Sequence, residues 1–494
     1  MRLRSWRPSW DYIPAEIRII ILEKLAKQKH PGWASLASVC REWQCVLEKF
    51  NFHKISLQVS CLDDLSLQVS CLDGFALLSP QTRKLVHHIY FCVELPGYSY
   101  KCCSQHRSPL INVSPLVTDA ILRLFSILST WEPAGNLALE LNVYSPSDCK
   151  HWFKNIHLSS DNVDREGDAT PTAGTGTLGT GTDRKHGWFW GQQLEPPQRH
   201  AIQRLFKPIR LKLPKSSPQV KAVTRLIIRR QLRRCISVKS FDCMFRKLNH
   251  LEQISYEPWK PCDNWHTDEK KAYGFEMRCL PDTVNSLVIF EDSYRFYDQF
   301  RLWPLQSIQP AGHSKEIDAG FVSKSLKLQH LSISFMINAE SLFQKCQSDW
   351  TWPRLQSLAL TSKLLQHEHR APITNLLCRA GVLAQQMPMI HTFVLWNCEK
   401  AHACAFIYRV EKGTASVTWR GTWNFKLRPH VVEAWQVVAS KRRMHRSELQ
   451  LKQDDIKAAI NCPGDAIYHL KLPCQVIEPA SLWQIRREGH TIWW

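Results

Sequence analysis

The sequence predicts an α/β fold in which a small N-terminal helical unit precedes an irregular solenoid of strand–helix units. Residues 13–52 repeat apolar side chains at helical spacing. Hexads with apolar residues at positions one, four and six recur through the second half of the 494-residue chain. The pieces between these hexads, such as 339–346 and 375–387, have helical composition. Such alternation suits strand–helix–strand crossovers and a parallel sheet.

The N-terminal unit is expected to form three short helices. In the first, Pro14 suits the first helical position and Glu16 lies at the positive end of the helix dipole. Pro31 and Gly32 should end that helix. The apolar positions of the three helices are Ile13, Ile17, Ile20, Ile21 and Leu25, then Trp33, Leu36 and Val39, then Val39, Trp43, Val46, Leu47 and Phe50. About 40 residues cannot sustain an independent core, so this surface indicates either a partner or a helical cap on the following domain.

This segment resembles an F-box, and it resembles most closely the F-box proteins of filamentous fungi. The opening Ile13-Pro14 corresponds to the Leu-Pro of that family, and Val39-Cys40-Arg41-Glu42-Trp43 corresponds to its Val-Cys-x-x-Trp signature. Between these motifs, Glu16-Ile17, Ile21-Leu22 and Leu25 follow the family order. One element departs, because His30-Pro31-Gly32-Trp33 stands where many F-boxes carry Asp-Leu.

The resemblance implies a substrate-recognition subunit of an SCF-type cullin-RING ubiquitin ligase, which is not itself an enzyme and needs no cofactor. Such a subunit binds a Skp-type adaptor, and through it the cullin scaffold, and presents an unknown protein substrate, which the net charge of +20 predicts to be acidic or phosphorylated. It is expected in the cytoplasm, the nucleus or both. The implied adaptor-binding residues are Ile13, Pro14, Glu16, Ile17, Ile21, Leu25, Val39 and Trp43.

The hexads match the strand portion of a leucine-rich repeat, with irregular spacing. They begin at Val223, Leu251, Val284, Leu328, Leu355 and Ile390, with further candidates at Val86, Leu139 and Ile467. Stacked units would leave one curved face free for binding, whereas in a compact α/β domain the same hexads would be buried strands. The expected division is 10–53 for the F-box, 54–158 for a first α/β segment, 159–197 for a disordered Thr/Gly-rich loop, 198–402 for the repeat region and 403–494 for a capping α/β region.

The formal net charge of +20 makes acidic partners plausible. Basic residues are dense between Lys207 and Lys247, where Asp242 is the single acidic residue, and again from Lys441 to Arg446. These runs are interpreted as a solvated face, as nuclear import signals or as an anion-binding surface. The alternative function is therefore an anion- or nucleic-acid-binding scaffold that uses the F-box for another assembly.

Two further sequence features, a glycine-rich motif and a tandem duplication, do not indicate a functional site. Gly174-x-Gly176-x-x-Gly179 lacks the flanking strand and helix of a dinucleotide site. The tandem copies at 56–65 and 66–75 could form a hairpin, or one copy could loop out beside a single strand.

The sequence offers no zinc pair of RING type and no hydrolase, NTPase or zincin motif. Cys398-x3-His402-x-Cys404 and His367-Glu368-His369 contain metal-ligand residue types at unsuitable spacings. The eighteen scattered cysteines are interpreted as free thiols. No apolar stretch of membrane-spanning length occurs, and no membrane partner is expected.

Overall fold

The computed structural model describes most of the chain, and the following account concerns only the described residues. These are 10–28, 32–61, 67–99, 112–154, 182–190, 192–260, 277–292, 319–399, 401–441 and 449–491.

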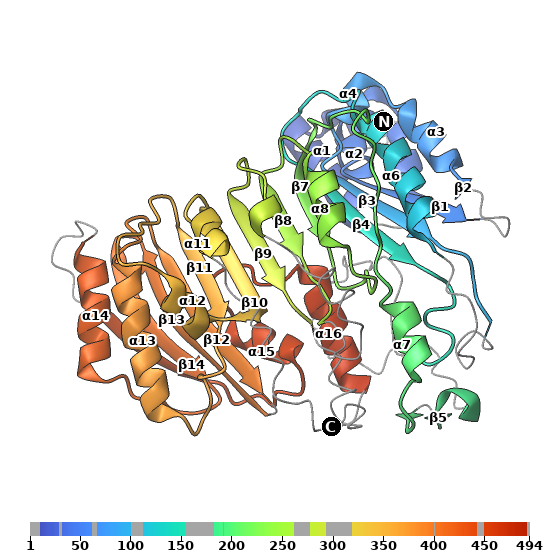
Figure 1. The fold of residues 1–494 in the computed structure, drawn as a ribbon. Helices are drawn as coiled ribbons and strands as arrows, with labels where there is room; N and C mark the ends of the chain where they lie inside the picture. The colour runs from blue at the N-terminus through green and yellow to red at the C-terminus, as the bar shows by residue number, and fades with distance from the viewer. Residues whose placement is uncertain are drawn as a thin grey trace, which may run out of the picture.

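The fold is mixed α/β, with one large, mostly parallel sheet (Figure 1). Its order is β15-β14-β13-β12-β11-β10-β9-β8-β7-β4-β3-β1-β2, so nearly every strand lies beside its predecessor in the chain. Only β2 and β13 run against the common direction. The strands are β1 (Lys54–Cys61), β2 (Leu67–Gln68), β3 (His88–Glu94), β4 (Leu137–Tyr144), β7 (Val223–Ile228), β8 (Gln253–Tyr256), β9 (Ser286–Phe290), β10 (His330–Asn338), β11 (Ser357–Thr361), β12 (Thr392–Glu399), β13 (His402–Glu411), β14 (Thr414–Gly421) and β15 (Gln450–Asp455).

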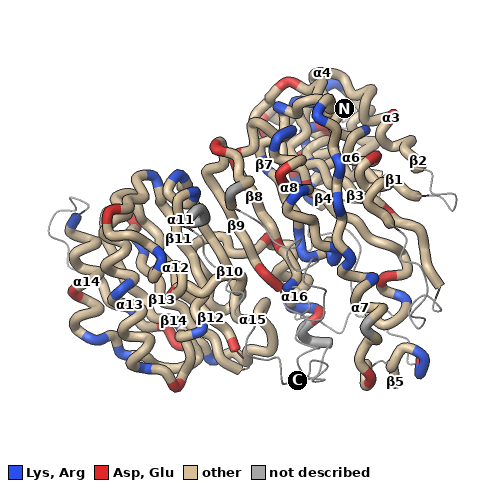
Figure 2. Tube along the Cα trace, in the orientation of Figure 1, with Lys and Arg blue, Asp and Glu red and all other residues tan. Residues whose placement is uncertain are grey.

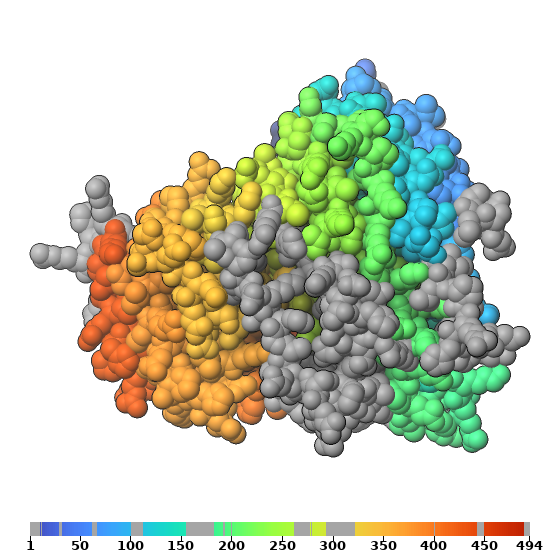
Figure 3. Space-filling view, in the orientation of Figure 1, coloured from blue at the N-terminus to red at the C-terminus, as the bar shows by residue number. Residues whose placement is uncertain are grey.

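Helices cover one face of this sheet along its length (Figure 1). The helices packed there are α3 (Ser70–Ala76), α6 (Ser114–Leu128), α8 (Val238–Phe245), α11 (Ala319–Ser325), α12 (Ala339–Lys345), α13 (Arg370–Ala384) and α14 (Pro429–Ser440). The remaining short elements are α4 (Pro80–Arg83), α7 (Arg199–Leu205), η1 (Trp10–Tyr12), η3 (Arg184–His186) and η4 (Met277–Cys279). In space-filling form the first strands and α14 lie at opposite ends of an elongated molecule (Figure 3).

Alternation along each strand separates two apolar layers. On β12, Phe393 and Leu395 join the helix-covered core, whereas Val394 and Trp396 join a second cluster on the other face. The hexads beginning at 86, 139, 223, 251, 284, 328, 355 and 390 all overlap strands. Their apolar positions were therefore a sound guide to the sheet.

The units of the sheet begin in the same way. The carbonyl oxygen of the residue before a strand accepts two backbone N–H groups from the next unit. Glu252 accepts from Asn285 and Ser286, and Asn285 accepts in turn from Gln329 and His330. In the same way, the carbonyl of Gln329 accepts from Gln356 and Ser357, and the carbonyl of Gln356 accepts from His391 and Thr392. This repeated backbone contact fixes the register of β8 through β12 at their amino ends.

The second face of the sheet is partly covered by the C-terminal segment. Helices α15 (Pro463–Leu470) and α16 (Pro479–Thr491) pack there on β9 and β11–β13. The hexad predicted at Ile467 is wrong, because residues 467 and 470 are one helical turn apart and both are buried in α15. The curved face expected to be free is thus occupied over the second half of the sheet.

Two other predictions need correction, and the hairpin predicted for the repeat is found in part. The second N-terminal helix is a 3-10 helix, η2 (Trp33–Ser38), which follows Gly32 at φ +83°. The two copies of the ten-residue repeat are not equivalent: the first forms β1, and the second forms α3 after β2, which pairs antiparallel with the end of β1 as the hairpin alternative predicted. The loop expected through residue 197 contains β5 (Trp188–Phe189) and β6 (Gln192–Gln193), which pair with each other and place Trp188 in a buried site.

Residues 155–181, which hold the glycine motif, lie outside the described residues. The basic run from 442 to 446 does so as well.

Candidate functional site

The N-terminal helical module comprises α1 (Ala15–Gln28), η2 and α2 (Arg41–Asn51). Its own core contains three fully buried apolar residues, Leu22, Ala26 and Leu47. Half-buried side chains, including Trp33 and Trp43, surround these three. A core this small leaves most of the apolar surface of α1 without an internal partner.

Glu42 connects the start of the module to α2. Its carboxylate accepts hydrogen bonds from Trp10 Nε1 at 3.0 Å and from Arg18 Nε at 2.8 Å. These two donors lower the pKa of Glu42 below its ordinary value. Arg18 also donates to the carbonyl of Ile13 at 2.9 Å, and the Trp10 and Trp43 rings lie 5.5 Å apart. The residues preceding α1 are thereby held against α2.

The eight predicted adaptor-binding residues fall into two groups. Pro14, Glu16, Ile17 and Val39 are exposed, whereas Ile13, Ile21, Leu25 and Trp43 are half-buried. Leu25 and Trp43 pack against the module core and can only support a surface.

Sequence comparison with the F-box pattern missed three exposed apolar residues. Tyr12 is 79% exposed, Ile20 is 50% exposed and Ile19 is 41% exposed. Ile17, at 46%, lies one turn before Ile20 and shares its side of α1. Helical spacing had already identified Ile17 and Ile20 as apolar positions of this helix, and the structure places them opposite its buried residues, Leu22 and Ala26.

The module is attached to the sheet by a short connection. Only Phe52 and His53 separate α2 from β1. Phe52 packs against the main core, and the carbonyl of His53 accepts N–H groups of His87 and His88 at 3.0 and 2.9 Å. The His53 and His87 rings stack at 4.8 Å. These contacts place the module at the edge where the parallel strands begin.

The basic segment does not form one continuous exposed surface. Arg229, Arg230, Arg233 and Arg234 are each at most 4% exposed. Arg234 pairs with Asp148, in the turn after β4, at 2.8 Å, and Arg229 pairs with Glu140 in β4. Figure 2 shows acidic and basic positions side by side near α16. The interpretation of these four residues as a solvated or anion-binding face is wrong, because each needs a carboxylate to offset the cost of burial.

Two of these arginines fasten the C-terminal segment. Glu488 of α16 accepts from Arg230 at 2.7 Å and from Arg233 at 3.0 Å. Arg230 also pairs with Asp292, and both guanidinium groups lie over the ring of Trp259. A second contact nearby joins Arg225 to Glu478 at 2.6 Å. We name this set the C-terminal clasp, and it consists of Arg225, Arg230, Arg233, Trp259, Asp292, Glu478 and Glu488.

Beside the clasp, Glu257 is fully enclosed between β8 and the C-terminal segment. It accepts N–H groups of Arg230 at 2.9 Å and Glu478 at 2.8 Å, together with the hydroxyl of Ser481. Burial outweighs these hydrogen bonds and raises the pKa of Glu257 to about 7.

The contribution of Glu257 to stability should fall as pH rises. Because its folded pKa exceeds the ordinary value of 4.5, folding takes up a proton, so its contribution is present below pH 4.5 and is lost as pH rises through about 7. We expect Glu257→Gln to gain in melting temperature relative to the parent between pH 5 and 8. The exposed variant Glu368→Gln should follow the parent. A pH-independent difference for Glu257→Gln would contradict this.

The two metal-ligand candidates meet in space but remain incomplete. The rings of His367 and His402 stack at 5.7 Å, and both meet Trp423 edge-on. Among the described residues, no group of three or more His, Cys, Asp or Glu side chains could hold a metal ion. All cysteines in the described ranges are free thiols, and no helix there has the length and apolar content to cross a membrane.

Comparison with known protein families finds a match in the second half of the chain. Residues 279–478 match the model of a family of unknown function (DUF6546). The matched region runs from η4 to the end of the connection between α15 and α16. No curated protein matches the chain.

Proposed function

We propose that this protein is a substrate receptor of an SCF-type cullin-RING ubiquitin ligase. The N-terminal helical module would act as an F-box and bind the Skp-type adaptor. The observation that carries the proposal is the exposed apolar side of α1, with Ile17 and Ile20, on a module that has three fully buried apolar residues. Such a surface on a rigidly attached module suits a protein partner.

The sheet would be the recognition half, in the manner of an irregular leucine-rich-repeat-like solenoid. Two features support that interpretation. Strand order follows chain order from β3 to β15, and the doubled carbonyl contact recurs at the start of successive units. Units of this kind add one neighbour at a time and present a long surface to a partner.

The mechanism is positioning. The receptor would hold its substrate near a ubiquitin-charged enzyme bound elsewhere on the scaffold, and the rate gain would come from effective concentration. The connection of Phe52 and His53 supports this mechanism, because a flexible linker between the adaptor and the substrate surface would dilute that effect. The chain itself would supply no covalent chemistry.

The test is replacement of Pro14 and Ile17 by Ala in the full chain. We expect recovery of the Skp-type adaptor in co-purification to fall about tenfold, since a loss of about 1.4 kcal/mol at a central interface contact lowers affinity by that factor. Val382→Ala, on the exposed side of α13, is the matched control because its side chain is 62% exposed. Undiminished adaptor recovery with the folded double variant would overturn the proposal.

The alternative function is a scaffold that binds anions or nucleic acid. The structure leaves fewer exposed basic residues for it than the sequence suggested. The basic residues still exposed in that segment are Arg210, Lys212, Lys215, Lys221, Lys239 and Arg246. Binding through phosphates would weaken steeply as salt is raised, whereas docking of an apolar helix face would persist. A salt titration of adaptor and nucleic-acid binding therefore separates the two functions.

A further inference from the structure

The two end strands of the sheet differ in what they offer to a neighbour. At one end, β2 has two residues and presents little backbone. At the other end, β15 has six residues, and β14 is its single neighbour among the described strands. Only Asp454 in β15 is half-buried, and its other residues are exposed. An open strand of this length presents N–H and C=O groups with which another strand can pair.

The contact with β14 shows which backbone groups of β15 point outward. In a parallel pair, both groups of one residue point to the same side, and those of the next residue point to the other side. The N–H of Ile456 donates to the carbonyl of Gly421 in β14 at 2.8 Å, so the even-numbered residues face β14. Leu451, Gln453 and Asp455 therefore point their N–H and C=O groups outward, where no described residue pairs with them.

The side chains of β15 carry charges in a self-complementary order. Lys452 and Asp454 flank Gln453 and lie on one face of the sheet. Asp454 accepts from Arg420 of β14 at 2.7 and 3.0 Å, and both contacts use Oδ2. Lys452 is exposed and makes no ion pair with a described residue. Within the described part of the chain, the edge thus offers one unpaired ammonium group and one uncommitted carboxylate oxygen, Oδ1 of Asp454.

We propose that β15 pairs antiparallel with β15 of a second copy of this chain, about a two-fold axis through Gln453. In this register the two Gln453 residues exchange both backbone hydrogen bonds, and Leu451 does the same with Asp455 of the second copy. Lys452 then lies opposite Asp454 of the second copy at a non-hydrogen-bonded position, where facing side chains are closest. The symmetry repeats this contact, so each copy supplies the opposite charge to the other.

The neighbouring registers are less favourable. Pairing centred on Asp455 would set two carboxylates against each other. Pairing centred on Leu451 would require the N–H of Leu449, which already donates to Oε1 of Gln436 at 2.9 Å. A contact made by the same strand in both copies is closed, so the assembly stops at two copies.

Charged residues on an edge strand can also prevent pairing. That role requires an approaching strand to leave the charges buried and unpaired, or to meet charges of its own sign. A second copy in the proposed register does neither. Leu451, which is 54% exposed, also gives no protection, because an apolar side chain on an open edge favours association.

The proposed dimer does not depend on adaptor docking. Strand order places β15 at the opposite end of the sheet from β1 and the N-terminal helical module. Figure 1 shows the same separation between α14, which lies between β14 and β15 in the chain, and helices α1 and α2. Both modules of a dimer would stay accessible, so failure of either proposal leaves the other standing.

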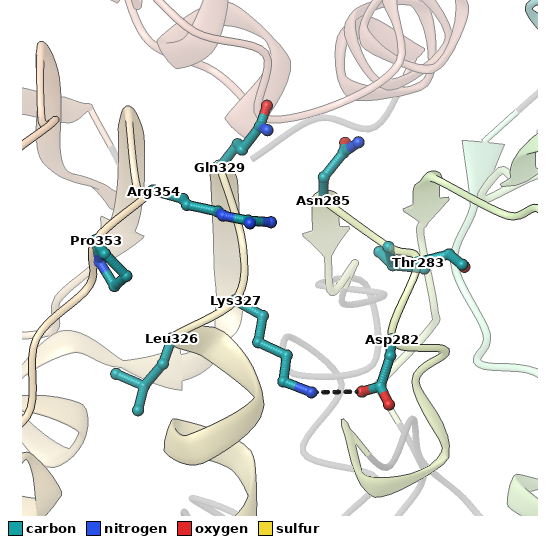
Figure 4. Close-up of a pocket in the computed structure, with 9 residues that line it drawn as sticks. Asp282, Thr283, Asn285, Leu326, Lys327, Gln329, Pro353 and Arg354 are labelled. Carbon is teal, nitrogen blue, oxygen red and sulfur yellow. Dashed lines mark hydrogen bonds and ion pairs between the residues drawn. The ribbon is translucent and has the colours of Figure 1, made fainter.

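A concave surface elsewhere is the competing place for self-association. A hollow of about 470 Å³ lies where β9, β10 and β11 begin, and its lining comes from the starts of these three units. Figure 4 shows Lys327 paired with Asp282, at 2.9 Å, and Arg354 extending toward β9. Arg354→Glu reverses a charge in this hollow and is the control for a contact made there.

The test is the mass of the purified full chain by sedimentation velocity at about 1–100 µM, which covers weak and moderate affinities. We expect a dimer that dissociates on dilution. Gln453→Pro should be a monomer throughout, because proline removes the N–H at the axis. That N–H makes no bond to a described residue, and edge strands accept proline where the N–H faces outward. The melting temperature should therefore stay close to the parental value.

A charge reversal tests the ion pairs separately. Lys452→Glu should raise the Kd of the dimer about tenfold, because two like-charge contacts replace two opposite-charge contacts. Lys363→Glu makes the same change in net charge at an exposed site after β11 and should keep the parental Kd.

Cysteine crosslinking tests the position of the axis. Gln453→Cys should give an intermolecular disulfide on oxidation, because facing Cα atoms of a hydrogen-bonded pair lie about 5.5 Å apart. Leu451→Cys should not, because its counterpart in the second copy lies about 14 Å away along the strand. The parent, oxidised in parallel, gives the background from the native cysteines.

Three results would overturn the proposal. The first is a parent chain that stays monomeric at about 100 µM. The second is a dimer that persists in Gln453→Pro, and its loss in Arg354→Glu would then assign the contact to the hollow. The third is equal crosslinking of the Leu451→Cys and Gln453→Cys variants, which would exclude the two-fold axis through Gln453.

Discussion

Glu488→Ala is expected to release α16 from the sheet and to destabilise the protein by about 3–5 kcal/mol. The carboxylate of Glu488 neutralises Arg233, whose side chain is 1% exposed, and shares Arg230 with Asp292. Without it, the buried Arg233 would lose its ion pair with Glu488. We expect a lower melting temperature, together with faster protease cleavage and amide exchange at residues 479–491.

Matched variants separate charge from packing. The double variant Arg233→Met/Glu488→Met should recover most of the loss, because apolar residues of similar volume commonly replace a buried pair at little cost. Asp119→Ala breaks the half-exposed pair with Arg123 and should cost less than about 1 kcal/mol. If Glu488→Ala lowered the stability as little as Asp119→Ala does, the clasp would not hold the C-terminal segment.

Much of the sheet was predictable, because the local pattern of apolar residues identifies each of these strands. A buried strand in a parallel sheet needs apolar residues at fixed intervals whatever surrounds it. Leu328, Leu331 and Ile333 illustrate this, as all three are buried at or within β10. Helices α12 and α13 were likewise visible from composition between two such strands.

Long-range pairing was not predictable in the same way. The arginines at 229–234 looked like a basic surface because their partners, Asp148 and Glu488 among them, lie far away in the sequence. The hexad at Ile467 failed for a related reason, since its spacing also fits a helix and only the sheet beneath decides between the two. The hollow at the starts of β9, β10 and β11 was not predictable either, because its lining comes from three separate units.

In the ten-residue duplication, nearly identical residues adopt different secondary structures. Val59 lies in β1, whereas the corresponding Val69 directly precedes α3. The first copy pairs in parallel with β3, and the second can only pair at the outer edge, where β2 is two residues long. Tertiary context therefore outweighs local preference in these segments.

Ile17→Glu/Ile20→Glu is expected to lower adaptor affinity about a hundredfold or more, because two carboxylates would be buried against an apolar partner. The substitution is designed to leave the fold intact. Both side chains are about half exposed in the free protein, at 46% and 50%, and Glu has a higher helix propensity than Ile. Glutamate near the start of α1 also interacts favourably with the helix dipole.

The measurement is adaptor binding by the folded full chain, with melting temperature recorded in parallel. Val382→Glu places a glutamate on a more exposed site, on α13, and this variant should bind the adaptor as the parent does. Loss of binding with an unchanged melting temperature would locate docking on the exposed side of α1, including Ile20, which the F-box pattern did not mark. Parental affinity in the double variant would remove α1 from the interface, because no adaptor could bind through that side and tolerate both charges.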